Sequence, residues 1–266
     1  MLLQKTYLTL HFRYKKHKNM NLTKVKEDRQ DRNSEAWKKL CEYIDELARS
    51  GGEEFAPYEV LGLDLYRQIY TLPESISKLK KVKKMWLYGS SLKRIPPEIG
   101  EMESLEYFDP YTSYDLMWFP YEITKCKKLK DSRVSTRALY GNVKNGKPFP
   151  YLTHNPVRYF SDTVKCSICG KEMTYEATNQ LWISLWVGTD ILPLLINSCS
   201  KECESSLPLS MDENSSSHKG GPGIKVDRNK IQRVSMPIQK EKTDEEKLPE
   251  DEKPPLLKLI KKIWDK

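Results

Sequence analysis

A short phrase that recurs at a nearly constant spacing constrains this chain more than any other feature. The phrase is an apolar residue followed by Pro, with Ile three residues later and a second apolar or Cys residue three further on. It occurs as Leu72-Pro73-x-x-Ile76-x-x-Leu79, Ile95-Pro96-x-x-Ile99-x-x-Met102 and Phe119-Pro120-x-x-Ile123-x-x-Cys126. The step from Pro73 to Pro96 is almost the same as the step from Pro96 to Pro120. This period predicts units that stack on their neighbours to build one continuous core.

A second phrase lies between the copies and is clearest as Met85-x-Leu87-x-x-Ser90-x-Leu92. Together the two phrases resemble the leucine-rich repeat, a unit of roughly 20–29 residues that reads L-x-x-L-x-L-x-x-N/C-x-L, in its Leu-Pro-x-x-Ile subtype. The resemblance covers residues 60–142 and implies an α/β fold, a short solenoid with a concave face of strands. Repeats of this kind bind partners more often than they catalyse reactions.

The phase of the repeats predicts which side chains leave the core. We expect strands at 63–65, 85–87, 105–107 and 132–134, and alternate residues of a strand face opposite ways. The residues predicted to lie on the concave face and bind a partner are Asp64, Tyr66, Trp86, Tyr88, Glu106, Phe108 and Arg133. Exposed aromatic residues are enriched at binding hot spots. The alternative is that the N-terminal arm or the downstream segment folds back and covers them.

A helix is expected at 34–49, just before the repeats. Ser34 suits the N-cap, and Ser50-Gly51-Gly52 suits the end of a helix. Its apolar residues fall at helical spacing on one face: Trp37, Leu40, Cys41, Ile44 and Leu47. Because the end of a stacked core needs a cover, we interpret residues 34–59 as an N-terminal helical cap.

Four of the six cysteines form two close pairs, Cys166/Cys169 and Cys199/Cys203. In a chain without an evident export signal, close pairs indicate metal ligands before disulfides. Four thiolates suit a closed tetrahedral Zn²⁺ site with a structural role. Redox or disulfide chemistry, or no metal at all, remains open at this point.

The two pairs resemble those of treble-clef zinc fingers, in which C-x-x-C-G lies in a hairpin and C-S-x-x-C opens a short helix. Residues 143–206 would then form a connector and a zinc module. The segment between the pairs, 170–198, is longer than in compact members and carries an apolar run, 181–197. We expect this run to be buried against the cysteine turns or the last repeat, where it would close the other end of the solenoid.

Both ends of the chain differ from the middle in composition. Residues 1–33 are basic and contribute to the net charge of +8. We expect them to form a disordered arm, or the first nineteen to result from a start codon assigned upstream of the true one. Residues 207–266 have the composition of a flexible tail, which ends in a basic amphipathic helix. That helix could dock on a partner or on this chain, contact a membrane, or have no role.

These features predict a cytoplasmic protein that is not an enzyme and that binds a protein partner, while Zn²⁺ holds one module in shape. The compact chain and simple domain content suggest a bacterial source. The run 181–197 contains Asp190 and Pro193 and is too short and too polar to span a membrane. Two alternatives stay open. One is a nucleic-acid-binding protein that uses the basic arm and the zinc module. The other is an accessory or enzyme-associated subunit. The oligomeric state and the partner's identity are not predicted.

Overall fold

The computed structural model describes residues 29–142, 148–152, 156–208 and 210. It mixes helices and strands, as the sequence predicts. Positions 1–28 of the expected basic arm and nearly all of the tail, including its amphipathic end, lie outside the described residues. Among the described residues no helix is long and apolar enough to cross a membrane.

The predicted capping helix is confirmed as α2 (Glu35–Ser50). The Ser34 hydroxyl accepts a hydrogen bond from the backbone N–H of Trp37, and Gly51 ends the helix in the left-handed conformation with its N–H bonded to the Leu47 carbonyl. Ala36, Trp37, Leu40 and Ile44 are buried on one face. This face covers the first unit of the core, where α2 contacts the first 3-10 helix.

Residues 29–33, assigned from the sequence to the disordered arm, instead pack on the fold. The side chain of Gln30 accepts a hydrogen bond from the Tyr70 N–H at 2.7 Å and donates to the Gln68 carbonyl at 3.2 Å. The Arg32 guanidinium forms two hydrogen bonds to the Glu74 carboxylate. Residues just before the capping helix therefore contact the first unit of the stack.

The first predicted strand, 63–65, is wrong. This segment belongs to α3 (Pro57–Tyr66), which is kinked at Gly62, and the first strand is β1 (Glu54–Phe55). Pro57 stands at the start of α3, where its missing N–H costs nothing. Gly62 has φ +71°, so α3 consists of two short helical segments; Leu61, on the first, is buried, whereas Leu63, on the second, is exposed.

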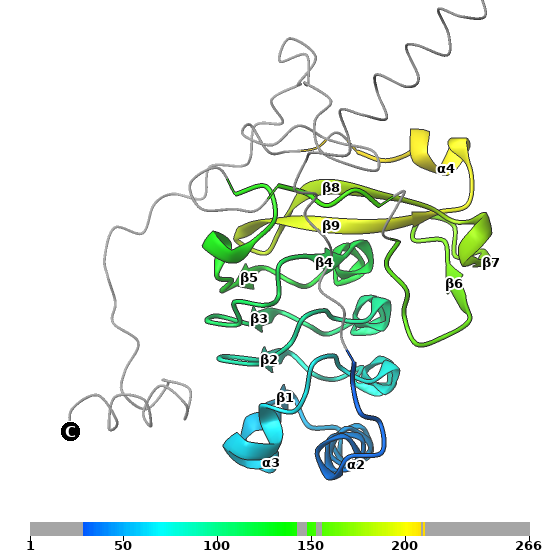
Figure 1. Ribbon diagram of the computed structural model, residues 1–266. Coiled ribbons are helices and arrows are strands. Elements are labelled where there is room, and N and C mark those ends of the chain that lie inside the picture. The colour runs from blue at the N-terminus through cyan, green and yellow to red at the C-terminus, as the bar shows by residue number, and fades with distance from the viewer. Residues whose placement is uncertain (1–28, 143–147, 153–155, 209, 211–266) are drawn as a thin grey trace, which may run out of the picture.

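Four short strands form a parallel sheet in the order β1, β2 (Lys84–Trp86), β3 (Tyr107–Asp109) and β5 (Asp131–Ser132). The register pairs Met85 with Phe108 and Phe108 with Ser132, so these three residues occupy one inward position of successive units. Figure 1 shows the strands stacked one above the other, with the 3-10 helices on the opposite side of the core.

Each Pro of the recurring phrase starts a 3-10 helix: η1 (Glu74–Lys78), η2 (Pro97–Glu101) and η3 (Tyr121–Lys125). The preceding prolines have φ of −69°, −73° and −70°, the angle that the ring imposes. The Ile of each phrase is fully buried, and the three helices contact one another in sequence. A further 3-10 helix, η4 (Thr136–Ala138), follows β5.

Buried serines, rather than a ladder of asparagines, satisfy the backbone where the chain turns after each strand. The Ser113 hydroxyl donates to the Leu87 carbonyl at 3.0 Å and accepts from the Ser90 N–H at 3.1 Å. One unit later, the Ser135 hydroxyl accepts from the Thr112 N–H at 2.8 Å. These bonds link each unit to the next without leaving buried backbone groups unpaired.

A second sheet closes the other end of the stack. It consists of β4 (Phe119–Pro120), β9 (Asp190–Ser198) and β8 (Asn179–Val187), with β4 and β9 parallel and β8 and β9 antiparallel. Leu192, Leu194 and Ile196 lie in the same core cluster as the strands and 3-10 helices. Most of the apolar run 181–197 is therefore buried against the end of the stack, as expected, although Trp186 is exposed.

The remaining elements surround this hairpin. A second core cluster, centred on Trp118, Tyr140, Phe149 and Trp182, holds the connector against β8 and β9. The antiparallel pair β6 (Thr163–Lys165) and β7 (Glu172–Thr174) is followed by the 3-10 helix η5 (Tyr175–Ala177). The helix α4 (Lys201–Ser205) follows β9. Figure 1 places β6 and β7 alongside the 3-10 helices of the stack.

Candidate functional site

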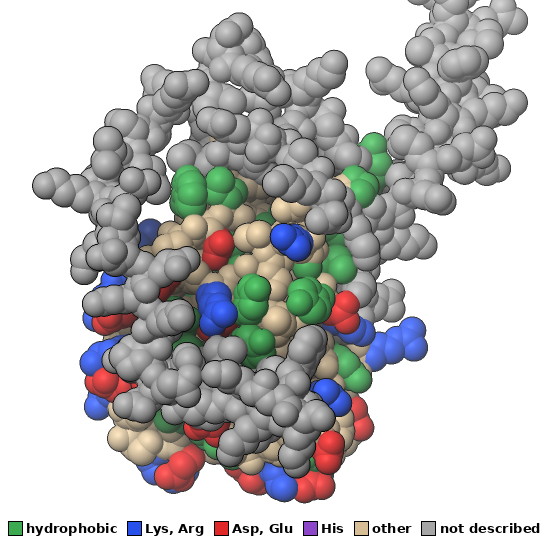
Figure 2. All heavy atoms as spheres, turned by 90° about the vertical axis from the view of Figure 1, so that its left-hand side faces the viewer, with side chains coloured by type: hydrophobic (Ala, Val, Ile, Leu, Met, Phe, Trp, Pro, Cys, Tyr) green, Lys and Arg blue, Asp and Glu red, His purple; other side chains and the backbone are tan. Residues whose placement is uncertain are grey.

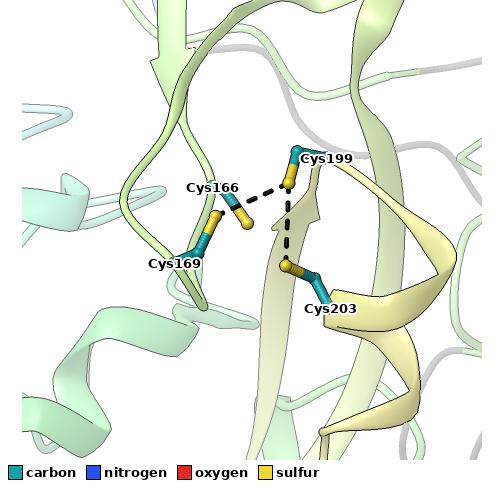
Figure 3. A group of neighbouring side chains, drawn as sticks. All are labelled: Cys166, Cys169, Cys199 and Cys203. Atoms are coloured by element: carbon teal, nitrogen blue, oxygen red, sulfur yellow. Dashed lines mark hydrogen bonds between the residues drawn. The ribbon is translucent and has the colours of Figure 1, made fainter.

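Two turns bring the four predicted metal ligands together. Cys166 and Cys169 lie in the turn between β6 and β7, whereas Cys199 and Cys203 come from the end of β9 and from α4. All four Sγ atoms lie within 4.8 Å of one another. The Sγ of Cys199 is 3.5 Å from that of Cys169 and 3.6 Å from that of Cys203. Figure 3 shows the four thiols converging on one point.

The backbone of each pair is fixed by local hydrogen bonds. The Cys166 N–H donates to the Lys171 carbonyl at 2.8 Å, and the Gly170 N–H donates to the Cys166 carbonyl at 2.9 Å. Gly170 has φ +77°, which a side chain would disfavour. On the other side, the Ser200 hydroxyl caps α4 by accepting from the Cys203 N–H. The glycine after the first pair and the serine after Cys199 therefore set the two turns.

The spacing of the sulfurs fits a metal ion and not a disulfide. A disulfide bond is about 2.05 Å long, and all four cysteines are free thiols. A tetrahedral Zn²⁺ with Zn–S bonds of about 2.3 Å places its ligands roughly 3.8 Å apart. The four cysteines could hold a metal ion, because four soft ligands at such separations can close a tetrahedral sphere.

The thiols have unequal pKa values for reasons that the geometry supplies. Burial opposes ionisation of Cys166, but hydrogen bonds from the backbone N–H groups of Cys169 and Ile168 lower its pKa to about 6. The contact with the Cys199 thiol raises the pKa of Cys203 to about 12. The contact with the Cys169 thiol likewise raises the pKa of Cys199. Several adjacent thiolates are disfavoured unless a cation compensates their charge.

The cysteine turn is also tied to the body of the fold. The Ser167 N–H donates to the Asn197 carbonyl at 2.7 Å, and the Asn197 N–H donates to the Ser167 hydroxyl at 3.0 Å. Asn197 lies on β9, two residues before Cys199. The two halves of the ligand set are thus held together by the backbone as well as by the cysteines.

The second candidate site is the outward face of the parallel sheet, which we call the sheet face. Its aromatic residues pack in two tilted pairs: the ring centroids of Trp86 and Tyr107 lie 4.9 Å apart, and those of Tyr88 and Tyr111 lie 6.0 Å apart. The Arg133 guanidinium lies 4.6 Å from the Tyr111 ring. Figure 2 shows hydrophobic side chains gathered in the middle of the surface opposite the 3-10 helices, with charged side chains among them.

Carboxylates fix the orientation of these rings. The Trp86 indole N–H donates to the Glu54 carboxylate at 3.0 Å. The Tyr107 hydroxyl donates to Asp109 at 3.2 Å, and the Tyr111 N–H donates to the same carboxylate at 3.0 Å. Burial raises the pKa of Asp109, although these bonds and Arg133 act in the opposite direction. Hydrogen bonds within the chain therefore hold the side chains of Trp86 and Tyr107 and the backbone of Tyr111 on the sheet face.

Three residues predicted for the concave face lie elsewhere. Phe108 and Tyr66 point inward and are buried, with Phe108 fully inaccessible, and Asp64 lies on α3 rather than on a strand. Glu106 precedes β3 and pairs with Lys130. The predictions for Trp86, Tyr88 and Arg133 agree with their positions on the sheet face.

The residues that the sequence reasoning missed are Tyr107, Asp109 and Tyr111. The third unit was phased three residues too early: the prediction aligned Trp86 with Glu106, whereas the sheet pairs Trp86 with Asp109. The spacing from Pro73 to Pro96 gives the period that would have placed the third strand correctly. Advancing Lys84 and Trp86 by that same step leads to Tyr107 and Asp109, which are their partners in the sheet.

Comparison with known proteins adds no relative to this picture: no protein-family model matches the chain, and no similar curated protein is found.

Proposed function

We propose that this chain is a short leucine-rich repeat solenoid that binds a protein partner through its sheet face and performs no catalysis. The observation that carries the proposal is the ordered aromatic cluster of Trp86, Tyr88, Tyr107 and Tyr111 beside Arg133. Tyr, Trp and Arg are the residue types that dominate binding hot spots. Tyr111 is the most exposed of them, with 38% of its surface accessible.

Pre-organisation supports the same conclusion. Binding usually costs free energy because side chains lose rotamer freedom, and rings that are already stacked and hydrogen-bonded lose less. Glu54 and Asp109 hold Trp86, Tyr107 and the backbone of Tyr111 in place. The charged groups around the rings would then select a partner surface with complementary charges.

We further propose that the four-cysteine site holds Zn²⁺ in a structural role. Four cysteine ligands fill a tetrahedral sphere and leave no position for a substrate or a reactive water. The ligands join the β6–β7 turn to the end of β9 and to α4. The metal would thereby keep the module that closes the stack in one arrangement.

The experiment is a comparison of three proteins in a nuclease-treated native lysate. The wild type, Trp86→Ala/Tyr107→Ala and Phe160→Ala are immobilised, and captured proteins are quantified by mass spectrometry. Phe160 is the matched control, because it is an exposed aromatic residue, 71% accessible, that stacks on Arg32 away from the sheet. We expect one partner that the wild type and Phe160→Ala retain and the double variant loses, by about tenfold or more.

Chemical denaturation of the three proteins establishes that each is folded. If the folded double variant retains every partner of the wild type, the sheet face is not the binding surface. If all three proteins capture partners only when the nuclease is omitted, and that capture falls steeply with salt, the chain binds nucleic acid instead.

A further inference from the structure

A pocket on the opposite side of the stack contains three buried oxygen atoms that have no hydrogen-bond partner. They are Oε2 of Glu98, Oε2 of Glu122 and the hydroxyl of Tyr159. All three residues line one cavity of about 240 Å³ between the 3-10 helices and the β6–β7 hairpin. Leaving a buried polar atom unpaired typically costs about 1–3 kcal/mol, so three in one place call for an explanation.

The two glutamates occupy the same position in successive repeats. Glu98 follows Pro96 by two residues in η2, and Glu122 follows Pro120 by two residues in η3. Because η2 and η3 contact each other, these equivalent positions bring both glutamates to the lining of one cavity. Glu122 is 6% exposed, so its unpaired oxygen is well shielded from solvent. Tyr159 approaches from the connector before β6 and contributes the third oxygen from a different segment.

The lining of the pocket is strongly acidic. Five glutamates and two lysines line it. The outer glutamates have partners: Glu74 pairs with Arg32 at 2.7 Å, and Glu101 pairs with Lys80 at 3.4 Å. Within the described part of the chain, neither Glu98 nor Glu122 forms an ion pair. The two inner carboxyl groups therefore lack a cationic partner, which a ligand could supply.

We propose that this pocket binds a guanidinium group. Its planar head presents five N–H donors, which can reach both carboxylates and the Tyr159 oxygen together, and it loses hydration more readily than an ammonium ion. The cavity is several times the roughly 30 Å³ that one water occupies in the liquid. The only group of three or more metal-ligating side chains among the described residues is the cysteine cluster, which disfavours a metal ion here.

This pocket is independent of the sheet face, which lies on the other side of the core. The guanidinium could belong to a small molecule or to an arginine side chain of a peptide. Both sources share the chemistry that the three oxygens recognise. An arginine in a peptide carries backbone amides beside its side chain, whereas a small guanidinium compound does not. The probes are therefore chosen to differ in this respect.

Isothermal titration calorimetry on the full-length, zinc-loaded protein tests the proposal. The probes are agmatine, acetyl-arginine amide and acetyl-citrulline amide, the last being an uncharged match for the second. We expect saturable binding of at least one guanidinium compound and none of the citrulline compound. Glu122→Gln should weaken that binding by about tenfold or more, because a charge-assisted hydrogen bond contributes about 1.5–3 kcal/mol. Preference for agmatine indicates a small molecule, and preference for acetyl-arginine amide indicates a peptide.

Two further variants separate recognition from folding. Tyr159→Phe removes only the unpaired hydroxyl and should also weaken binding, whereas Glu103→Gln, at an exposed glutamate just after η2 that does not line the pocket, should not. Zinc content and circular dichroism confirm that each variant is folded. The proposal is overturned if neither guanidinium compound binds up to about 10 mM, in which case the pocket holds only water, or if Glu122→Gln and the wild type bind equally.

Discussion

The strand stack and the cysteine module bury apolar surface to very different extents. The stack has one continuous core that runs from Ala36 on α2 through the strands and 3-10 helices to Ile196 on β9. The β6–β7 hairpin buries only Val164, Cys166, Met173 and Tyr175. A core of four side chains cannot offset the conformational entropy of the residues that it orders. Packing therefore stabilises the stack, whereas we propose that the module relies on a metal ion held by its four cysteines.

The two regions also differ in whether their buried polar groups have hydrogen-bond partners. In the stack, Ser90, Ser113 and Ser135 pair with buried backbone groups of the neighbouring unit. Beside the module, Glu98, Glu122 and Tyr159 keep unpaired oxygens. The hydroxyl of Ser75, on η1, is also unpaired but does not line the pocket, so the pocket is where unpaired oxygens gather.

The largest expected effect comes from removing the metal. A strong chelator, or Cys169→Ser, should make the backbone amides of β6, β7 and α4 exchange rapidly, while α2 to β5 keep their protection. Structural zinc in small modules contributes about 10–16 kcal/mol of binding free energy at neutral pH, which this hairpin cannot replace. Hydrogen exchange followed by mass spectrometry measures the effect. Unchanged protection in the metal-free protein would mean that packing alone holds the module.

The next largest effect is expected from Phe108→Ala, which leaves a cavity in the middle of the stack. Phe108 is fully buried and packs edge to face on Phe119, with ring centroids 5.8 Å apart. Such a truncation typically costs about 3–5 kcal/mol of unfolding free energy. Urea denaturation measures the loss, and zinc content should not change. Tyr107→Ala, one residue earlier on the exposed side, is the control and should cost much less.

Phe108 also marks what the sequence could and could not predict. The recurring Pro phrase correctly placed the core positions Ile76, Ile99 and Ile123, and the cysteine spacing correctly grouped the four thiols. Phe108 was assigned to the wrong face because an aromatic residue is compatible with either side of a strand. Only the period of the preceding unit resolves its orientation.

Two other errors have physical causes beyond local pattern. Leu61, Leu63 and Leu65 alternate like a strand, but Pro57 starts a helix and Gly62 kinks it, so the segment forms two short helical turns instead. The parallel pairing of β4 with β9 joins Phe119 to Leu194, and no local pattern specifies a contact between segments so far apart in the chain. The sequence could not predict the unpaired oxygens of the pocket either, because the burial of Glu122 depends on the β6–β7 hairpin that packs over it.

A smaller effect is expected from Glu122 as the pH changes. Burial raises the pKa of Glu122 to about 7 from an ordinary value of 4.5, although the Ser167 hydroxyl opposes the shift. The folded state binds this proton more tightly than the unfolded state, so stability is lost as the pH rises from 4.5 through 7. Between about pH 6 and about pH 8.5 the loss should be of order 1 kcal/mol. Urea denaturation without added ligand should show it in the wild type, whereas Glu122→Gln should lack this component. Parallel pH profiles would contradict the assignment.

The smallest effect is expected between Trp86 and Tyr107, whose rings meet on the solvent side of the sheet. A double-mutant cycle with Trp86→Phe and Tyr107→Leu should give a coupling free energy of about 0.5–1.5 kcal/mol in unfolding, the usual range for aromatic pairs. A Trp86–Phe160 cycle is the control and should give none, because Phe160 stacks on Arg32 instead. Coupling in the free protein would mean that the aromatic cluster is formed before any partner arrives. If the cycle gives no coupling, the rings are ordered only on binding, and the sheet face loses the pre-organisation from which its role was argued.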